Sequence, residues 1–87
     1  MSREECEYNK TMMIAIAKDR DAGMTEKQEV HQIVTQFTNA GFKQGLPGSE
    51  IVKTIDFWKG MTHMVYIHPQ MTPEQMGQAA EATCSNP

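Results

Sequence analysis

The chain has 87 residues and a net charge of −3, which is enough for one domain and leaves no room for a second core. Its eight Lys and Arg are dispersed, so no basic stripe indicates a nucleic-acid-binding surface. No apolar run approaches the ~20 residues that span a bilayer. The chain starts with the acidic, polar segment 1–5, which is not a signal peptide. For an exported protein, we therefore expect this to be the mature form, with Met1 in place of a removed leader.

Size and composition also bear on stability. A chain this short buries only roughly two-thirds of its unfolded surface, so its net stability should be marginal without an additional constraint. Eight Met stand against three Phe and one Trp. Because Met fills irregular gaps, this ratio indicates a soft core.

The first predicted helix runs from about Arg3 to Asp21 and ends near Gly23. The sequence predicts three capping boxes, which begin at Ser2, Thr25 and Thr72. In a capping box, a Ser or Thr side chain and a Glu or Gln side chain three residues later each accept a hydrogen bond from the other residue's backbone N–H. Helical spacing predicts an inward face of Tyr8, Met12, Ala15 and Ile16, with Cys6, Met13 and Ala17 on its flank.

The second predicted helix follows Thr25 and has an apolar stripe at helical spacing. Its members are Val30, Ile33, Val34 and Phe37. We expect this helix to stop at residues 39–41, with Gly41 in the left-handed conformation. Residues 42–48 then form the one longer loop.

The third predicted helix is capped by Ser49 and ends near Ile67, because the residue before Pro69 is disfavoured in the helical region. Its expected inward residues are Ile51, Val52, Ile55, Trp58, Met61 (or Thr62) and Val65. Gly60 weakens the helix by about 1 kcal/mol relative to Ala and indicates a close helix crossing or a kink. A short extended piece over residues 64–68 is the alternative.

The fourth predicted helix runs from Pro73 to about Cys84, with Met76, Ala79, Ala80 and Thr83 on one face. No segment alternates over the length that a strand needs. The sequence therefore predicts a single all-α domain over residues 1–87, a four-helix up-down bundle-like fold.

The two cysteines fall in the first turn of the first helix and the last turn of the fourth. In an up-down bundle these turns lie at the same end, so we expect a disulfide between Cys6 and Cys84. Closing a loop of this length stabilises by roughly 4–5 kcal/mol. The alternative is two unrelated reduced cysteines in a cytosolic protein. A disulfide favours a periplasmic or secreted location.

Motifs near both ends resemble a family of small exported helical proteins of Gram-negative bacteria that has no assigned function. The matching features are Cys6, the Arg20-Asp21-Ala22-Gly23 turn, the Tyr66-Ile67-His68-Pro69 segment followed by Met71-Thr72-Pro73-Glu74, and Cys84. The resemblance implies a periplasmic or secreted, disulfide-closed helical protein. It transfers no catalytic residues to this chain.

The densest group of soft metal ligands comprises Met61, His63, Met64 and His68, with Met71 beyond it. Thioether and imidazole groups together suit copper. On a helix, however, His63 points about 160° away from Met61, so the four converge only where the helix has ended by His63. Methionines at the core boundary and exposed histidines are the simpler interpretation, so we favour no metal and no cofactor.

No nucleophile with a base, and no carboxylate pair in an apolar cleft, indicates an enzyme. Trp58 lies on the inward stripe, whereas Phe57, Met64 and Tyr66 lie off it and are candidates for an interaction or dimer surface. The leading hypothesis is a non-catalytic periplasmic or secreted protein that contacts a protein partner, as an inhibitor, immunity or adaptor module. The alternative is periplasmic copper binding through the Met/His cluster 61–71.

Overall fold

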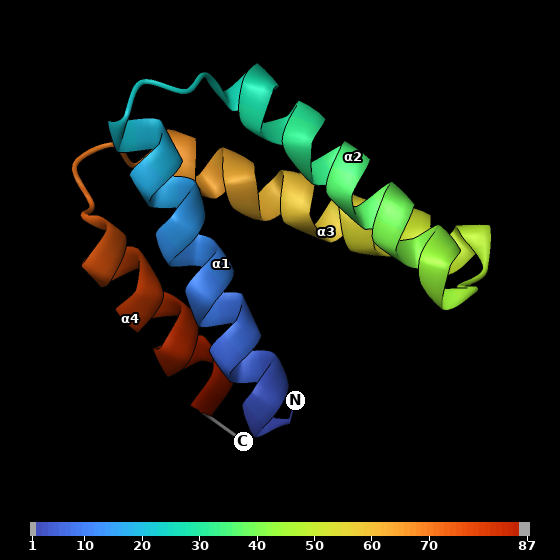
Figure 1. Ribbon diagram of the computed structural model, residues 1–87. Coiled ribbons are helices and arrows are strands. Elements are labelled where there is room, and N and C mark those ends of the chain that lie inside the picture. Colours follow the sequence, from blue (N-terminus) through green and yellow to red (C-terminus); the bar gives the residue numbers. More distant parts are fainter. Residues whose placement is uncertain (1, 86–87) are drawn as a thin grey trace.

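The computed structural model describes residues 2–85, which form four helices (Figure 1). They are α1 (Arg3–Asp21), α2 (Glu26–Gln44), α3 (Gly48–Tyr66) and α4 (Pro73–Ser85). The predicted all-α fold is confirmed, and the alternative of an extended piece at residues 64–68 is wrong, because α3 continues to Tyr66 and Ile67 takes a helical C-cap conformation. Within the described range, no helix combines the length and apolar content needed to cross a membrane.

Three of the helix starts follow the predicted capping chemistry. Ser2 Oγ accepts from the Glu5 N–H at 3.1 Å, and Thr25 and Thr72 each form a reciprocal capping box. The start of α3 differs, because Pro47 holds the N-cap position and its carbonyl accepts from the Glu50 N–H. The predicted Ser49 cap is wrong, since the N-cap lies two residues earlier and α3 begins at Gly48.

The end of α2 also differs from the prediction. The helix continues through Gly41 to Gln44, and Gly45 takes the left-handed conformation (φ 71°) that was expected for Gly41. A Cβ at Gly41 would lie 2.5 Å from Ile51 Cγ1, so this glycine allows α2 and α3 to approach closely. The predicted loop over residues 42–48 shrinks to residues 45–47.

The four helices form two antiparallel pairs, α1 with α4 and α2 with α3, which meet at one end and diverge at the other (Figure 1). We call the meeting point, where the linkers 22–25 and 67–72 lie, the vertex. The chain measures 37 × 33 × 15 Å, so it is thin in one direction. Gly77 allows α4 to approach α1 closely, as Gly41 does for α2 and α3, because a Cβ at Gly77 would lie 2.7 Å from Ile14. Gly60 has no such neighbour, so the expected crossing at that residue is wrong.

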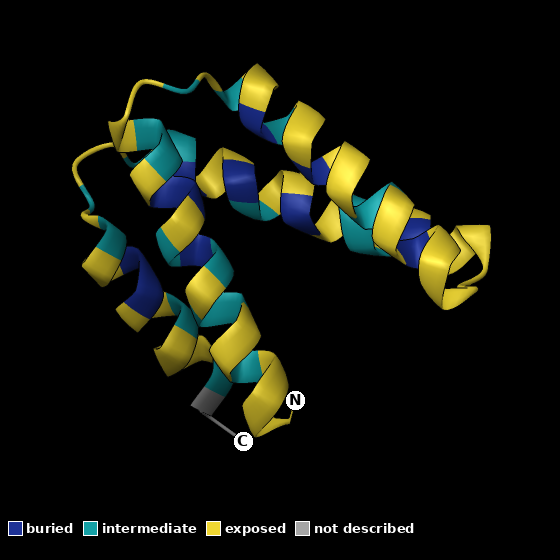
Figure 2. Ribbon diagram, viewed as in Figure 1, coloured by how far each residue is buried: buried dark blue, intermediate teal, exposed yellow. Residues whose placement is uncertain are grey.

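The core gathers residues from all four helices near the junction of the pairs (Figure 2). It comprises Met13, Ile16, Ala17, Ile33, Trp58, Val65 and Met76. On α1 the buried face is therefore rotated toward the predicted flank, and Tyr8 is half-exposed. Val52, predicted to point inward, is 56% exposed, whereas its neighbour Ile51 is buried, because the two side chains lie on different sides of the helix.

The predicted disulfide is confirmed. Cys6 on α1 and Cys84 on α4 are bonded, with their Cα atoms 5.6 Å apart. One turn farther along α1, the Lys10 ammonium pairs with the Glu81 carboxylate. The hydrogen bond and the negative charge of Glu81 raise the pKa of Lys10. These contacts fix the α1·α4 pair at the end remote from the vertex.

Removing the disulfide should lower the free energy of unfolding by about 4 kcal/mol, because the bond closes a loop of 78 residues in the unfolded chain. Guanidinium unfolding of the oxidised protein and the Cys6→Ser/Cys84→Ser variant measures this difference. An unchanged unfolding midpoint would contradict the structural role of the bond.

Candidate functional site

An apolar groove of about 540 Å³ lies on α1, α3 and α4. α3 and α4 both pack on α1 but make little contact with each other, so their facing side chains remain accessible. The groove is lined by Asn9 and Met13 of α1, by Phe57, Trp58, Met61 and Met64 of α3, by His68 and Met71 of the linker, and by Met76, Ala79, Ala80, Thr83 and Cys84 of α4.

Methionine dominates this groove. Five of the seven methionines in the described chain line it, and Leu46, the one leucine of the sequence, lies elsewhere. Leucine would fill an ordinary helical core with a more defined shape. Methionine is flexible and polarisable, and it suits surfaces that adapt to what they bind. The arrangement can therefore accept an apolar group or a soft ligand.

The groove has two chemically distinct ends. Farther from the vertex, near the middle of α3, Phe57 and Trp58 stand edge to face with ring centroids 5.2 Å apart, and the small side chains of Ala79 and Ala80 on α4 also line the groove. Tyr8 adds a second edge contact to Trp58 at 6.1 Å. Toward the vertex lie four of the five methionines and one imidazole, which together we call the sulfur end. Its members are Met61, Met64, His68, Met71 and Met76.

Two residues form an exposed apolar rim. Phe57 is 48% exposed and Met64 45% exposed, although both line the groove. Trp58, only 3% exposed, lies at the groove floor. As the one tryptophan of the chain, it is a natural fluorescent reporter of anything that enters.

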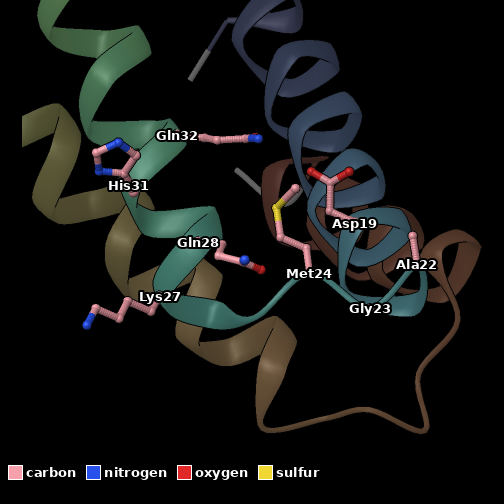
Figure 3. Close-up of a pocket in the computed structure, with 8 residues that line it drawn as sticks. All are labelled: Asp19, Ala22, Gly23, Met24, Lys27, Gln28, His31 and Gln32. Atoms are coloured by element: carbon pink, nitrogen blue, oxygen red, sulfur yellow. The ribbon is translucent and has the colours of Figure 1, made fainter.

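A second hollow, of about 740 Å³, lies where α1 turns into α2 (Figure 3). Asp19 and Met24 border one side, and Gln28 and Gln32 the other. This hollow is more open than the groove, and His31 also lines it. Less apolar surface lines this hollow than lines the groove.

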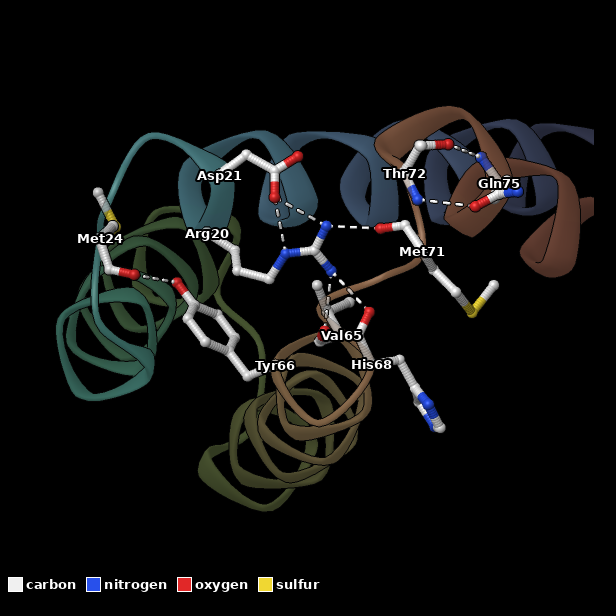
Figure 4. A network of polar contacts seen from close by, with 9 residues as sticks. All are labelled: Arg20, Asp21, Met24, Val65, Tyr66, His68, Met71, Thr72 and Gln75. Carbon is white, nitrogen blue, oxygen red and sulfur yellow. Dashed lines mark hydrogen bonds and ion pairs between the residues drawn. The ribbon is translucent and has the colours of Figure 1, made fainter.

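The vertex is held by one buried cation (Figure 4). Arg20, whose side chain is 7% exposed, donates to the carbonyl oxygens of Val65 (2.9 Å), His68 (3.2 Å) and Met71 (2.6 Å). Its Nε and Nη2 also contact Asp21 Oδ1 at 3.0 and 2.9 Å. The last carbonyls of a helix lack partners within the helix, so a guanidinium there both satisfies them and complements the helix dipole. Arg20 thereby joins the end of α1 to the end of α3 and to the following linker.

Tyr66 belongs to the same vertex. Its hydroxyl donates to the Met24 carbonyl at 2.8 Å, which ties α3 to the linker between α1 and α2. Burial, followed by the nearby Glu29 carboxyl, raises the pKa of Tyr66. The side chain is partly buried here, outside the groove.

A carboxyl pair lies beside this network. Glu29 of α2 is 4% exposed, and no partner within the described chain reaches its Oε2. Burial raises the pKa of Glu29 to about 7, and a hydrogen bond with the Asp19 carboxyl and the charge of Asp19 add to the effect. Below that pH, a protonated Glu29 donates to Asp19, whereas above it two carboxylates face each other.

The structure separates the residues singled out from the sequence into two groups. Phe57, Met61, Met64 and His68 all line the groove, together with Met71. His63 lies apart, with its Nδ1 3.1 Å from Glu26 Oε2, and Tyr66 serves the vertex. Within the described residues, no cluster of three or more His, Cys, Asp or Glu could hold a metal ion.

Sequence reasoning missed the contribution of α1 and α4 to the groove. Met13 is distant in sequence from residues 61–71, Met76 lies on the next helix, and each is explained locally as a core residue. Only the packing of α4 on α1 brings them to the same surface as α3.

Comparison with protein-family models, curated proteins and solved structures finds no match for this chain.

The stability of the protein should fall as the pH rises from about 5 to 8. Folded Glu29 keeps its proton up to a pKa of about 7, compared with the ordinary value of 4.5, so the folded state binds more protons in this window. We expect a loss of about 1–3 kcal/mol, measured by chemical denaturation at each pH.

The Glu29→Gln variant keeps a donor to Asp19 but cannot titrate, so its stability should vary much less over the same range. Glu50→Gln removes an exposed carboxylate on α3 and should retain the pH dependence of the parent protein. An undiminished slope in Glu29→Gln would show that the carboxyl pair is not its cause.

Proposed function

We propose that this chain is a non-catalytic binding protein of the bacterial cell envelope that holds an amphipathic helix of a partner protein in its Met-lined groove. The observation that carries this proposal is the gathering of five methionines, Phe57 and Trp58 along one open surface. Met-rich surfaces bind apolar helices because the flexible side chains can repack around different shapes.

The shape of the groove favours a helix as the occupant. α1, α3 and α4 supply three helices around one apolar surface, and the weak contact between α3 and α4 leaves the fourth side open. An added helix with apolar residues at i, i+3, i+4 and i+7 would cover the rim formed by Phe57 and Met64.

The distribution of charge favours a basic partner. α1 and α4 have formal net charges of −1 and −2, whereas α2 and α3 are neutral. α4 contains Glu74 and Glu81 and has no Lys or Arg between residues 73 and 85. A helix seated against α4 is therefore best matched when its polar face carries Lys or Arg, which favours both encounter and orientation.

The proposed location depends on two further observations. A disulfide persists in oxidising compartments such as the periplasm, and Cys6–Cys84 is such a bond. The sequence motifs also resemble those of small exported proteins of Gram-negative bacteria. An envelope protein that binds a partner helix fits an inhibitor, immunity or adaptor role.

Binding can be tested with three synthetic 16-residue peptides and the fluorescence of Trp58. The first has a leucine stripe and a lysine polar face, the second has the same stripe with glutamate, and the third is a scramble of the first. We expect saturable binding of the first peptide, and dissociation constants at least about tenfold higher for the other two, from lost apolar and charge complementarity.

Met64→Glu should weaken binding of the lysine peptide by about tenfold or more, because it places a charge in the apolar rim. Val52→Glu is the matched control, since Val52 is 56% exposed but lies outside the groove. Equal binding of all peptides, or no effect of Met64→Glu, would refute the proposal. So would a concentration-dependent dimer that Met64→Glu abolishes, because a second copy would then occupy the groove.

A further inference from the structure

We infer that the sulfur end of the groove is a binding site for Cu(I), with Met61, Met71 and Met76 as thioether ligands and His68 as the imidazole ligand. This inference goes beyond the proposed function and does not depend on it. It uses the vertex end of the groove, whereas the aromatic end carries Phe57 and Trp58.

The chemistry of the lining selects a soft cation. Every charged side-chain type is absent from the described lining, so a hard cation such as Mg²⁺ or Ca²⁺ finds no carboxylate there. Cys84 also lines the groove, but it is held in the disulfide and supplies no thiolate. The remaining soft donors are the thioether sulfurs and one imidazole, beside the Asn9 amide and the Thr83 hydroxyl, and thioether ligands favour Cu(I).

The solvent exposure of these side chains increases from Met76 to Met64. Met76 is 4% exposed, Met61, His68 and Met71 are partly buried, and Met64 is 45% exposed at the rim. An ion held by the inner three sulfurs would thus be largely shielded from water, with Met64 beside the entrance. A core methionine cluster without such an opening would give an ion no path.

His68 is positioned from the backbone. Its carbonyl accepts from Arg20 at 3.2 Å, which fixes this part of the linker, and no hydrogen bond joins its ring to another described residue. The ring of His68 and the thioether of Met71 both point away from Arg20 on the same side (Figure 4). Because the Arg20 contacts hold both carbonyls, the two ligands are preorganised relative to each other.

The test is an anaerobic titration of the disulfide-bonded chain with Cu(I) in competition with bicinchoninate. Native mass spectrometry with Ag(I), a redox-inert soft cation, measures the stoichiometry, and intact mass confirms that the disulfide remains closed. We expect one ion per chain. His68→Ala and Met61→Leu/Met71→Leu should each weaken binding by about tenfold or more, since loss of even an outer-shell partner has that effect at metal sites.

Two matched controls isolate the site. His63→Ala removes a histidine that contacts Glu26 outside the groove, and Met24→Leu removes a methionine that borders the other hollow. Both should bind Cu(I) like the parent protein. No bound ion, or equal weakening by the control and site variants, would overturn the inference.

The same variants distinguish this inference from the proposed function. Leucine keeps the volume and apolar character of methionine but removes the thioether, so Met61→Leu/Met71→Leu should lose Cu(I) whatever its affinity for the lysine peptide. If this variant keeps the parent affinity for Cu(I), the copper site is refuted whatever the peptide result.

Discussion

The Arg20 guanidinium connects two parts of the chain that are more than 40 residues apart in the sequence. It lies at the end of α1 and donates to the carbonyls of Val65, His68 and Met71, which belong to the end of α3 and the next linker. Hydrogen bonds from a charged donor are each worth about 1.5–3 kcal/mol, and a buried guanidinium without them would be strongly unfavourable. The position of α3 relative to α1 follows from this set of contacts, together with the Tyr66–Met24 hydrogen bond.

The other contacts hold α1 and α4 together as one pair, and the second pair, α2 with α3, diverges from it. The disulfide and the Lys10–Glu81 ion pair hold α4 along α1, while Gly41 lets α2 and α3 approach closely. α3 is fastened near the vertex and leans away from α4, so apolar side chains between them are left without a helical neighbour. The groove is therefore a consequence of where the chain is fastened. The carboxyl pair at Glu29 makes the same vertex sensitive to pH.

Much of the fold could be predicted from the sequence because it depends on local chemistry. The caps at Ser2, Thr25 and Thr72 are decided within four residues, and the disulfide followed from antiparallel helix order. The choice between Gly41 and Gly45 as the end of α2 was not predictable, because Gly41 is needed against Ile51 of another helix. The candidate site was predicted only in part for the same reason. Its α3 and linker residues form a sequence cluster, but its remaining residues are brought in by packing of α1 and α4.

The central claim, that Arg20 fastens the end of α3 to α1, is tested most directly by amide hydrogen exchange in the Arg20→Met variant with the disulfide intact. The amides of Ile67, His68 and Met71 bond to carbonyls in or beside the network. They should exchange at least about tenfold faster in the variant, while amides near Gly41 at the far end of α2 keep their protection. Unchanged protection at residues 67–71, or an equal loss along the whole chain, would contradict the account.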